Sequence, residues 1–142
     1  LVGSEMCIRD RINKYGIKDK FHFTGMIDAD CMAEQYRLAN VFVCPSSIEN
    51  SPNSLGEAQL VGCPVVASYV GGVPDMVENG RTGLLYRFKE TEMLASAVCR
   101  IFGDDNLAQN MAVNEIEVAQ KRHDGVRNAK RMLEIYKLIA CI

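Results

Sequence analysis

Short apolar runs that alternate with helix-patterned segments constrain this chain of 142 residues more than any other feature. Three such runs are bounded by proline or glycine: NVFVC at 40–44, PVVAS at 64–68 and TGLLY at 82–86. Short, nearly continuous apolar strands separated by helices are typical of a parallel sheet with helices on both faces. The sequence therefore predicts an α/β domain of this architecture.

The rest of the chain predicts one further strand and several helices. A helix ends near Gly16, and Phe21 and Phe23 alternate with polar neighbours as strand residues do. Asp28 and Asp30 are candidate caps of the helix that follows. Helices are also predicted over 52–62 and 73–79 and throughout the segment beyond Lys89, where one apolar stripe consists of Met93, Leu94, Ala97, Val98 and Ile101 and a later one of Ala129, Met132, Leu133, Tyr136 and Ile139.

Composition argues against several classes of function. Apolar residues make up 48% of the chain and charged residues 24%, which is typical of one globular domain. The net charge is −2 with both signs interspersed, so the chain lacks the basic field of nucleic-acid-binding proteins, and no nucleic-acid partner is predicted. No apolar run approaches the ~20 residues that span a bilayer.

Cysteines and histidines form no recognisable metal-binding pattern. The six cysteines never occur as C-x-x-C and lie mostly among apolar neighbours, which predicts reduced thiols in a cytoplasmic protein and leaves a disulfide as the alternative. His22 and His123 have no ligand-spaced partner, so no metal is expected.

The amino-terminal segment LVGSEMCIRDR lacks both an initiator methionine and the pattern of a signal peptide. We expect residues 1–11 to be a foreign or miscalled segment. The domain itself is expected to occupy 12–142 and to be incomplete at its start.

A helix start lies within the stretch PSSIENSPNSLGEA at 45–58. Ser51 and Pro52 fit an N-cap followed by the first helical residue, which leaves the backbone N–H groups of Asn53 and Ser54 free at the positive end of the helix dipole. Because the stretch follows a predicted strand, it lies at the carboxyl edge of the sheet, where ligands of such domains bind. The pattern predicts a phosphate or diphosphate site.

Two glutamates, Glu49 and Glu57, flank this helix start. Glu57 shares a helix face with Asn53 and can accept hydrogen bonds from vicinal hydroxyls such as those of a ribose. Glu49 precedes the helix and is expected on the other side of the phosphate, where a sugar would lie. On spacing alone, two solvated glutamates are the alternative.

Four ordered motifs carry a resemblance to a known family. E-x7-E after P-S is followed by G-C-P-V-V-A-S, then by G-G-V-P-D and by N-G-x-T-G-L-L, all within 41–86. This pattern resembles the signature of family 4 glycosyltransferases, and the resemblance extends from about residue 12 to the carboxyl end. It implies the GT-B fold, in which two Rossmann-like domains face each other across a cleft. The chain resembles the C-terminal, nucleotide-sugar-binding domain of such a retaining hexosyltransferase of polysaccharide or glycolipid biosynthesis.

The resemblance implies a role for each matching position. Glu49, as the candidate catalytic residue, contacts the donor sugar near the reacting centre, and Glu57 binds the ribose hydroxyls. The loop 24–27 lies near the base. The other implied donor-binding residues are Asn50, Ser51, Asn53, Ser54, Leu55, Gly25 and Met26. No metal or other cofactor is implied, and the partners are a nucleotide-sugar donor and an acceptor glycan or glycolipid.

The sequence departs from the family pattern in two respects. Many members carry an aromatic-glycine pair after the first glutamate, where this chain has Asn50, Ser51 and Pro52. The family's phosphate-binding arginine and lysine, the first strands of the domain and the whole acceptor-binding domain are expected upstream of Ile12. Because transfer needs the phosphate charge stabilised and the acceptor oriented, the chain by itself is expected to be inactive.

Other interpretations stay open at the level of the sequence. A sugar-nucleotide 2-epimerase shares the GT-B architecture, and a non-catalytic relic is a third possibility. Gly71 and Gly72 fit either a close approach of the backbone to the donor or a turn with positive φ. Residues 121–137 carry six basic and two acidic side chains, which fits a solvated face, a brace for the other domain or peripheral contact with the inner face of a membrane.

Overall fold

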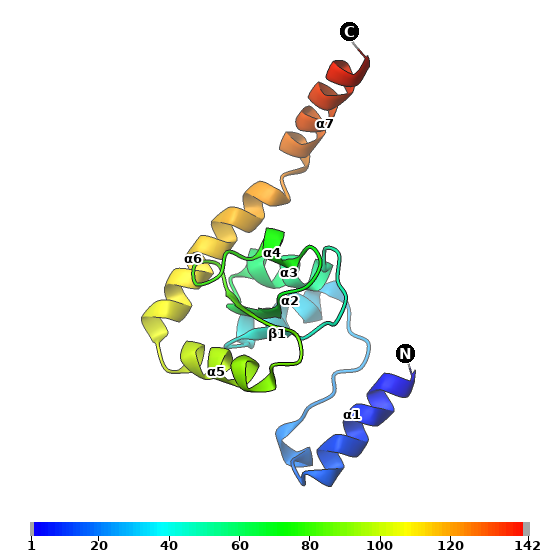
Figure 1. Ribbon diagram of the computed structural model, residues 1–142, viewed down its shortest axis with the longest axis vertical. Helices are drawn as coiled ribbons and strands as arrows, with labels where there is room; N and C mark the ends of the chain where they lie inside the picture. Colours follow the sequence, from blue (N-terminus) through cyan, green and yellow to red (C-terminus); the bar gives the residue numbers. More distant parts are fainter. Residues whose placement is uncertain (1, 141–142) are drawn as a thin grey trace.

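The computed structural model describes residues 2–140, with side chains from Met6 onward, and contains a three-stranded sheet flanked by helices (Figure 1). The elements in chain order are α1 (Val2–Lys14), the 3-10 helix η1 (Lys18–Lys20), α2 (Ala29–Leu38), β1 (Phe42–Cys44), α3 (Asn53–Val61), β2 (Val65–Ser68), α4 (Val73–Met76), β3 (Leu84–Tyr86), α5 (Thr91–Phe102), α6 (Asp105–Arg122) and α7 (Gly125–Ala140).

The sheet is parallel throughout, in the order β1-β2-β3. Side chains of the central strand β2 alternate between two apolar clusters, as strand geometry requires. Val65 and Ala67 join the cluster that contains Leu55 of α3, whereas Val66 joins the cluster that contains Met111 of α6. The predicted α/β architecture with helices on both faces of a parallel sheet is confirmed.

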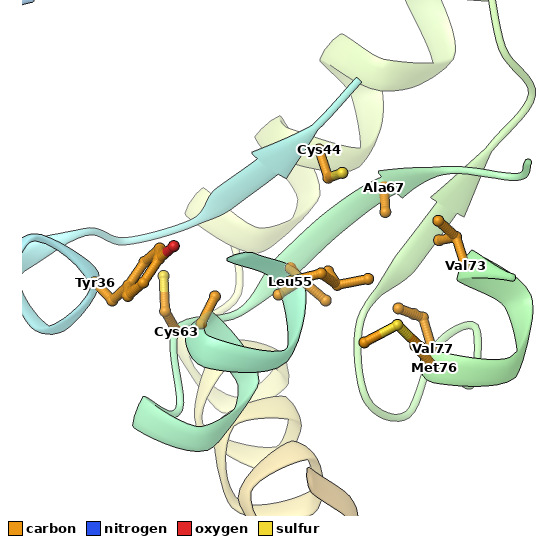
Figure 2. Close-up of a cluster of buried hydrophobic side chains, with 10 residues drawn as sticks. Tyr36, Cys44, Leu55, Cys63, Ala67, Val73, Met76 and Val77 are labelled. Carbon is orange, nitrogen blue, oxygen red and sulfur yellow. The ribbon is translucent and has the colours of Figure 1, made fainter. Parts of the chain in front are cut away.

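The first of these clusters fixes α3 against the sheet. Figure 2 shows Leu55 between the strands and α4, with Ala67 of β2 and Met76 of α4 nearby. Leu55 is fully buried, and α3 ends at Gly62, which takes the left-handed conformation with φ 83°. Because α3 follows β1 in the chain, its first turn lies at the carboxyl edge of the sheet, and this packing holds the helix there.

The predicted strand around Phe21 and Phe23 is wrong. Residues 21–25 have no regular secondary structure, and the side chains of Phe21 and Phe23 are 48% and 38% exposed. An alternating pattern becomes a strand only when a neighbouring strand satisfies its backbone groups, and among the described residues none pairs with this segment. The nearby prediction for α2 is confirmed in part: Asp28 caps the helix by accepting a hydrogen bond from the N–H of Cys31 at 2.8 Å, and Asp30 lies in its first turn.

The two terminal helices extend from this body (Figure 1). Helix α7 has no buried residue, so the predicted apolar stripe that includes Met132, Leu133 and Tyr136 is exposed. Its other face is basic. Within residues 2–140 no helix is both long and apolar enough to cross a membrane.

Candidate functional site

The loops that follow β1 and β2 meet at the carboxyl edge of the sheet. The N–H of Gly72 donates to the carbonyl oxygen of Glu49 at 3.3 Å. A Cβ on Gly71 would collide with that same carbonyl oxygen, and a Cβ on Gly72 would collide with the carbonyl oxygen of Asn50. Gly71 also has a positive φ of 50°. The glycine pair is thus required by backbone packing against the loop after β1, and at Gly71 by the turn as well.

Glu49 is held in place by its own loop. Its carboxylate oxygen Oε1 accepts a hydrogen bond from the hydroxyl of Ser46 at 3.0 Å. The carbonyl oxygen of Ser46 in turn accepts a hydrogen bond from the buried hydroxyl of Ser68, at the end of β2, at 2.6 Å. Glu49 is half-buried, and this chain of contacts orients its side chain toward Ser46.

Helix α3 begins between the two glutamates, one residue later than predicted. Pro52 occupies the N-cap position and Asn53 is the first helical residue. Ser51 does not cap the helix, because its hydroxyl donates to the sulfur of Met76 at 3.6 Å. The N–H of Leu55 donates to the carbonyl oxygen of Pro52 at 3.2 Å.

The first two amide groups of α3 are open to a ligand. Within residues 2–140 no hydrogen-bond acceptor contacts the N–H groups of Asn53 and Ser54, and both residues are exposed. Two free N–H groups at the positive end of a helix form a site that favours phosphate. The structure thus has the free N–H groups that the predicted anion site requires, and the binding of an anion there stays a prediction.

Glu57 lies on the exposed face of α3 and contacts α2. Its Oε2 accepts a hydrogen bond from the hydroxyl of Tyr36 at 3.4 Å. Burial and the charge of Glu57 raise the pKa of Tyr36 to about 12, so this hydroxyl stays a donor at neutral pH. A pocket of about 270 Å³ lies beside this pair, with Met32 and Val61 also in its wall. Glu57 can therefore accept hydrogen bonds at the wall of a mostly apolar pocket.

The structure brings most of the predicted residues together, but not all of them. Glu49, Asn50, Ser51, Asn53 and Ser54 lie on one loop and helix start, with Glu57 one turn further along α3. The side chain of Leu55 faces the core, so only its backbone is near the site.

Gly25 and Met26 lie apart from this group. They belong to the loop before α2, where Gly25 has φ 66° and Met26 is fully exposed. Among the described residues no hydrogen bond joins this loop to 45–57, and the pocket beside Glu57 has neither residue in its wall.

The sequence patterns did not predict two serines that position Glu49 and its loop. Ser68 ends β2 and Ser46 lies two residues after the end of β1, so both are at the carboxyl edge of the sheet, where polar side chains reach the ligand site of such domains. That position, and the spacing of three residues from Ser46 to Glu49, was the available signal. Within residues 2–140 no cluster of three or more metal-ligating side chains exists, and the expectation that no metal is needed stays a prediction.

Comparison with known families decides what kind of domain this is. The sequence profile described as glycosyl transferases group 1 matches residues 1–104. The chain belongs to this family. The match includes 1–11, and the foreign origin of that segment stays a prediction.

Curated relatives of this group 1 glycosyltransferase domain include characterised and uncharacterised proteins. Alpha-maltose-1-phosphate synthase from Mycolicibacterium smegmatis is 36% identical over 121 residues, which cover 81% of this chain and 31% of that protein. An uncharacterised glycosyltransferase from Methanocaldococcus jannaschii is 26% identical over 131 residues, which cover 92% of this chain and 34% of that protein. The chain thus spans about a third of the length of the curated relatives it matches. Their names favour a glycosyltransferase over the 2-epimerase.

Solved structures confirm the fold class of the group 1 domain. Sucrose-phosphate synthase from Thermosynechococcus elongatus superposes with a TM-score of 0.88 at 32% identity, over 98% of this chain and 35% of that chain. Anabaena HepE in complex with UDP superposes with a TM-score of 0.87 at 26% identity, over 96% of this chain and 38% of that chain. The domain therefore has the Rossmann-like fold of part of a GT-B glycosyltransferase.

Proposed function

We propose that this chain is the donor-binding part of a retaining family 4 glycosyltransferase and that it holds a nucleoside-diphosphate sugar along the carboxyl edge of its sheet. The observation that carries the proposal is the junction of the loops after β1 and β2, where Gly71 and Gly72 pack against the backbone of Glu49 and Asn50 beside the free start of α3. The UDP in the HepE complex supports a nucleotide as the ligand.

Each part of the proposed site has a separate task. The N–H groups of Asn53 and Ser54 bind the diphosphate, because they are free donors at a helix N-terminus. Glu57 accepts hydrogen bonds from the ribose hydroxyls, since a carboxylate is an acceptor with two oxygens. Glu49 contacts the sugar near the reacting carbon. The side chains of Asn50 and Ser51 and the backbone of Leu55 complete the sugar and diphosphate contacts, and the loop with Gly25 and Met26 lies near the base.

The reaction we assign to the complete protein is transfer of the sugar to an acceptor hydroxyl with retention of the anomeric configuration. Negative charge develops on the leaving diphosphate, and the helix start stabilises it without a metal. The acceptor glycan or glycolipid is bound by an N-terminal domain outside this chain. The 142-residue chain alone therefore transfers no sugar, and measurable turnover by it would contradict this part of the proposal.

We expect helix α7 to be the part of this chain that contacts the other domain or a membrane. Its exposed stripe, which includes Leu133 and Tyr136, suits contact with the other domain of a cytoplasmic enzyme. Its basic face, which includes Lys130 and Arg131, suits peripheral contact with the inner face of a membrane.

Equilibrium titration of the complete protein tests the proposed ligand. UDP, ADP and GDP are titrated into the wild type, Glu57→Ala and Glu134→Ala by calorimetry. We expect at least one diphosphate to bind and Glu57→Ala to weaken it about tenfold, because a charge-assisted hydrogen bond contributes about 1.5 kcal/mol. Glu134 is a matched control, since it is an exposed glutamate of α7 whose only ion-pair partner among the described residues is Arg131, at 3.1 Å. Failure of all three nucleotides to bind, or equal affinity of Glu57→Ala and wild type, would overturn the proposal.

A further inference from the structure

Arg122, the last residue of α6, reaches into the layer that holds the helix start. Its Nη1 donates to Oε1 of Gln59 in α3 at 2.9 Å, and its Nη2 donates to the carbonyl oxygen of Met76 in α4 at 2.8 Å. A longer contact of 3.4 Å joins Nη2 to the carbonyl oxygen of Asp75. The planar guanidinium fork thus connects three helices through donors that point in fixed directions.

Gln59 closes the network. It is fully buried, and its Nε2 donates to the same carbonyl oxygen of Met76 at 3.0 Å. Without Arg122, Oε1 of Gln59 loses its charged donor inside the core, and a buried amide without its partner turns or admits water. The position of α4 relative to α3 therefore depends on a side chain contributed by α6.

Met76 also forms a hydrogen bond with the loop that contains Glu49, and so extends the network to that loop. Its sulfur accepts the hydroxyl hydrogen of Ser51 at 3.6 Å, and Ser51 precedes the N-cap of α3. The end of α6 also packs directly on α3: a Cβ added to Gly56 would lie 2.8 Å from Nε2 of His123. The end of α6 is thus connected to the first turns of α3 in two ways, by hydrogen bonds through Met76 and by direct packing of His123.

Arg122 also contacts the first turn of α7. The carbonyl oxygen of Arg122 accepts a hydrogen bond from Nδ2 of Asn128 at 2.8 Å, and Asp124 caps α7 by accepting from the N–H of Arg127 at 3.0 Å. The first turn of α7 and the start of α3 are therefore tied to one residue.

We propose that Arg122 is a positioning residue that holds the free start of α3, through Gln59 and Met76, in the direction needed to bind a diphosphate, and that it links this helix start to the first turn of α7. The inference rests on the proposed function, since it assigns a role within the same donor site. Helix N–H groups bind an anion only when they are aimed at it, so a small rotation of α3 weakens phosphate contacts more than base or ribose contacts.

The test compares a ligand with a diphosphate and one without it. The complete protein is prepared as wild type, Arg122→Ala, Arg122→Lys and Arg131→Ala, and circular dichroism confirms that each is folded at the temperature used. The dissociation constants of UDP and of uridine are measured by ligand-observed magnetic resonance. Arg131 is the matched control, because it is an exposed arginine whose only side-chain partner in the part of the chain that the structure describes is Glu134.

A positioning role changes the affinity for UDP but not for uridine, whereas a general loss of stability would weaken the binding of both. We expect Arg122→Ala to raise the dissociation constant of UDP about tenfold and to leave that of uridine unchanged, with Arg122→Lys in between and Arg131→Ala equal to wild type. Equal weakening of both ligands, or no weakening of either, would overturn the inference.

Amide hydrogen exchange separates this inference from the proposed function. If wild type bound none of UDP, ADP and GDP, the proposed function would fail, and the exchange measurement would still test the role of Arg122. Faster exchange confined to 49–57 and 71–77 in Arg122→Ala supports the positioning role, whereas uniform or unchanged exchange contradicts it.

Discussion

Gly71 and Glu49 lie in direct backbone contact, so close that a single added Cβ on Gly71 would overlap the carbonyl oxygen of Glu49. The contact joins the loops after β1 and β2, and it fixes the backbone on which Glu49 is carried. Because the clash is with backbone rather than with a flexible side chain, it can be relieved only by moving one of the two loops.

The first prediction concerns this contact. Gly71→Ala is expected to lower the free energy of unfolding by about 2 kcal/mol, through the clash and the positive φ, and to reduce nucleotide affinity because the loop that carries Glu49 moves. Urea unfolding and calorimetric titration measure the two effects. Gly125→Ala is the control, since a Cβ added there would lie more than 4 Å from every described atom outside its local backbone, and its φ is not positive. Normal nucleotide binding by Gly71→Ala would contradict the assignment of this loop to the site.

A second prediction follows from the hydrogen bond between Ser46 and Glu49. Ser46→Ala removes the donor that orients Glu49, so we expect the transfer rate of the complete protein to fall about tenfold with the affinity for the nucleoside diphosphate unchanged. Steady-state kinetics and titration provide the two values. Ser47→Ala is the matched control, because Ser47 is an exposed neighbour without a side-chain hydrogen bond in the described structure. A parallel loss of affinity in Ser46→Ala would show that Glu49 contacts more than the sugar.

A third prediction concerns Glu115, a fully buried carboxyl group of α6. Neither of its oxygens has a hydrogen-bond partner among the described residues, and burial raises its pKa to about 9. The folded state therefore keeps a proton that the unfolded chain releases near pH 4.5. Between these two values the unfolded state binds fewer protons, so the free energy of unfolding falls as pH rises, by up to about 1.4 kcal/mol per pH unit.

Urea unfolding at several pH values between 5 and 9 measures this slope. We expect Glu115→Leu to flatten the curve and to be more stable than wild type at pH 8, because an apolar side chain of similar size has no proton to lose. The control is Glu117→Gln, two residues along α6, where an exposed glutamate pairs with Lys121 and its pKa is lowered. An unchanged slope in Glu115→Leu would show that other groups cause the pH dependence.

The parts of the fold that could be predicted are those determined by nearby residues. The runs that became β1, β2 and β3 are apolar on both faces and bounded by proline or glycine, so their local pattern was sufficient. The segment with Phe21 and Phe23 has an equally regular pattern, but a strand also requires a neighbour, and sequence pattern alone does not supply one.

The site was predictable to a similar extent. The binding roles of Glu49 and Glu57 stay predictions, but the helix start between them followed from the order of residues. The role of Ser51 did not, because its hydroxyl bonds to Met76, which lies 25 residues along the chain. Arg122 was missed for the same reason, since it contacts Gln59 across 63 residues of sequence. Such contacts depend on tertiary packing, which local patterns do not encode.

The central claim is that Glu49 and Glu57 contact opposite ends of one nucleotide-sugar donor. The most direct test is the steady-state rate of sugar transfer by the complete protein as the donor concentration is varied, for wild type, Glu49→Ala and Glu57→Ala. We predict that Glu57→Ala raises the donor KM about tenfold, because it loses ribose hydrogen bonds, and that Glu49→Ala lowers kcat about a hundredfold, because it loses contact near the reacting carbon. Wild-type kinetics in both variants would contradict the account.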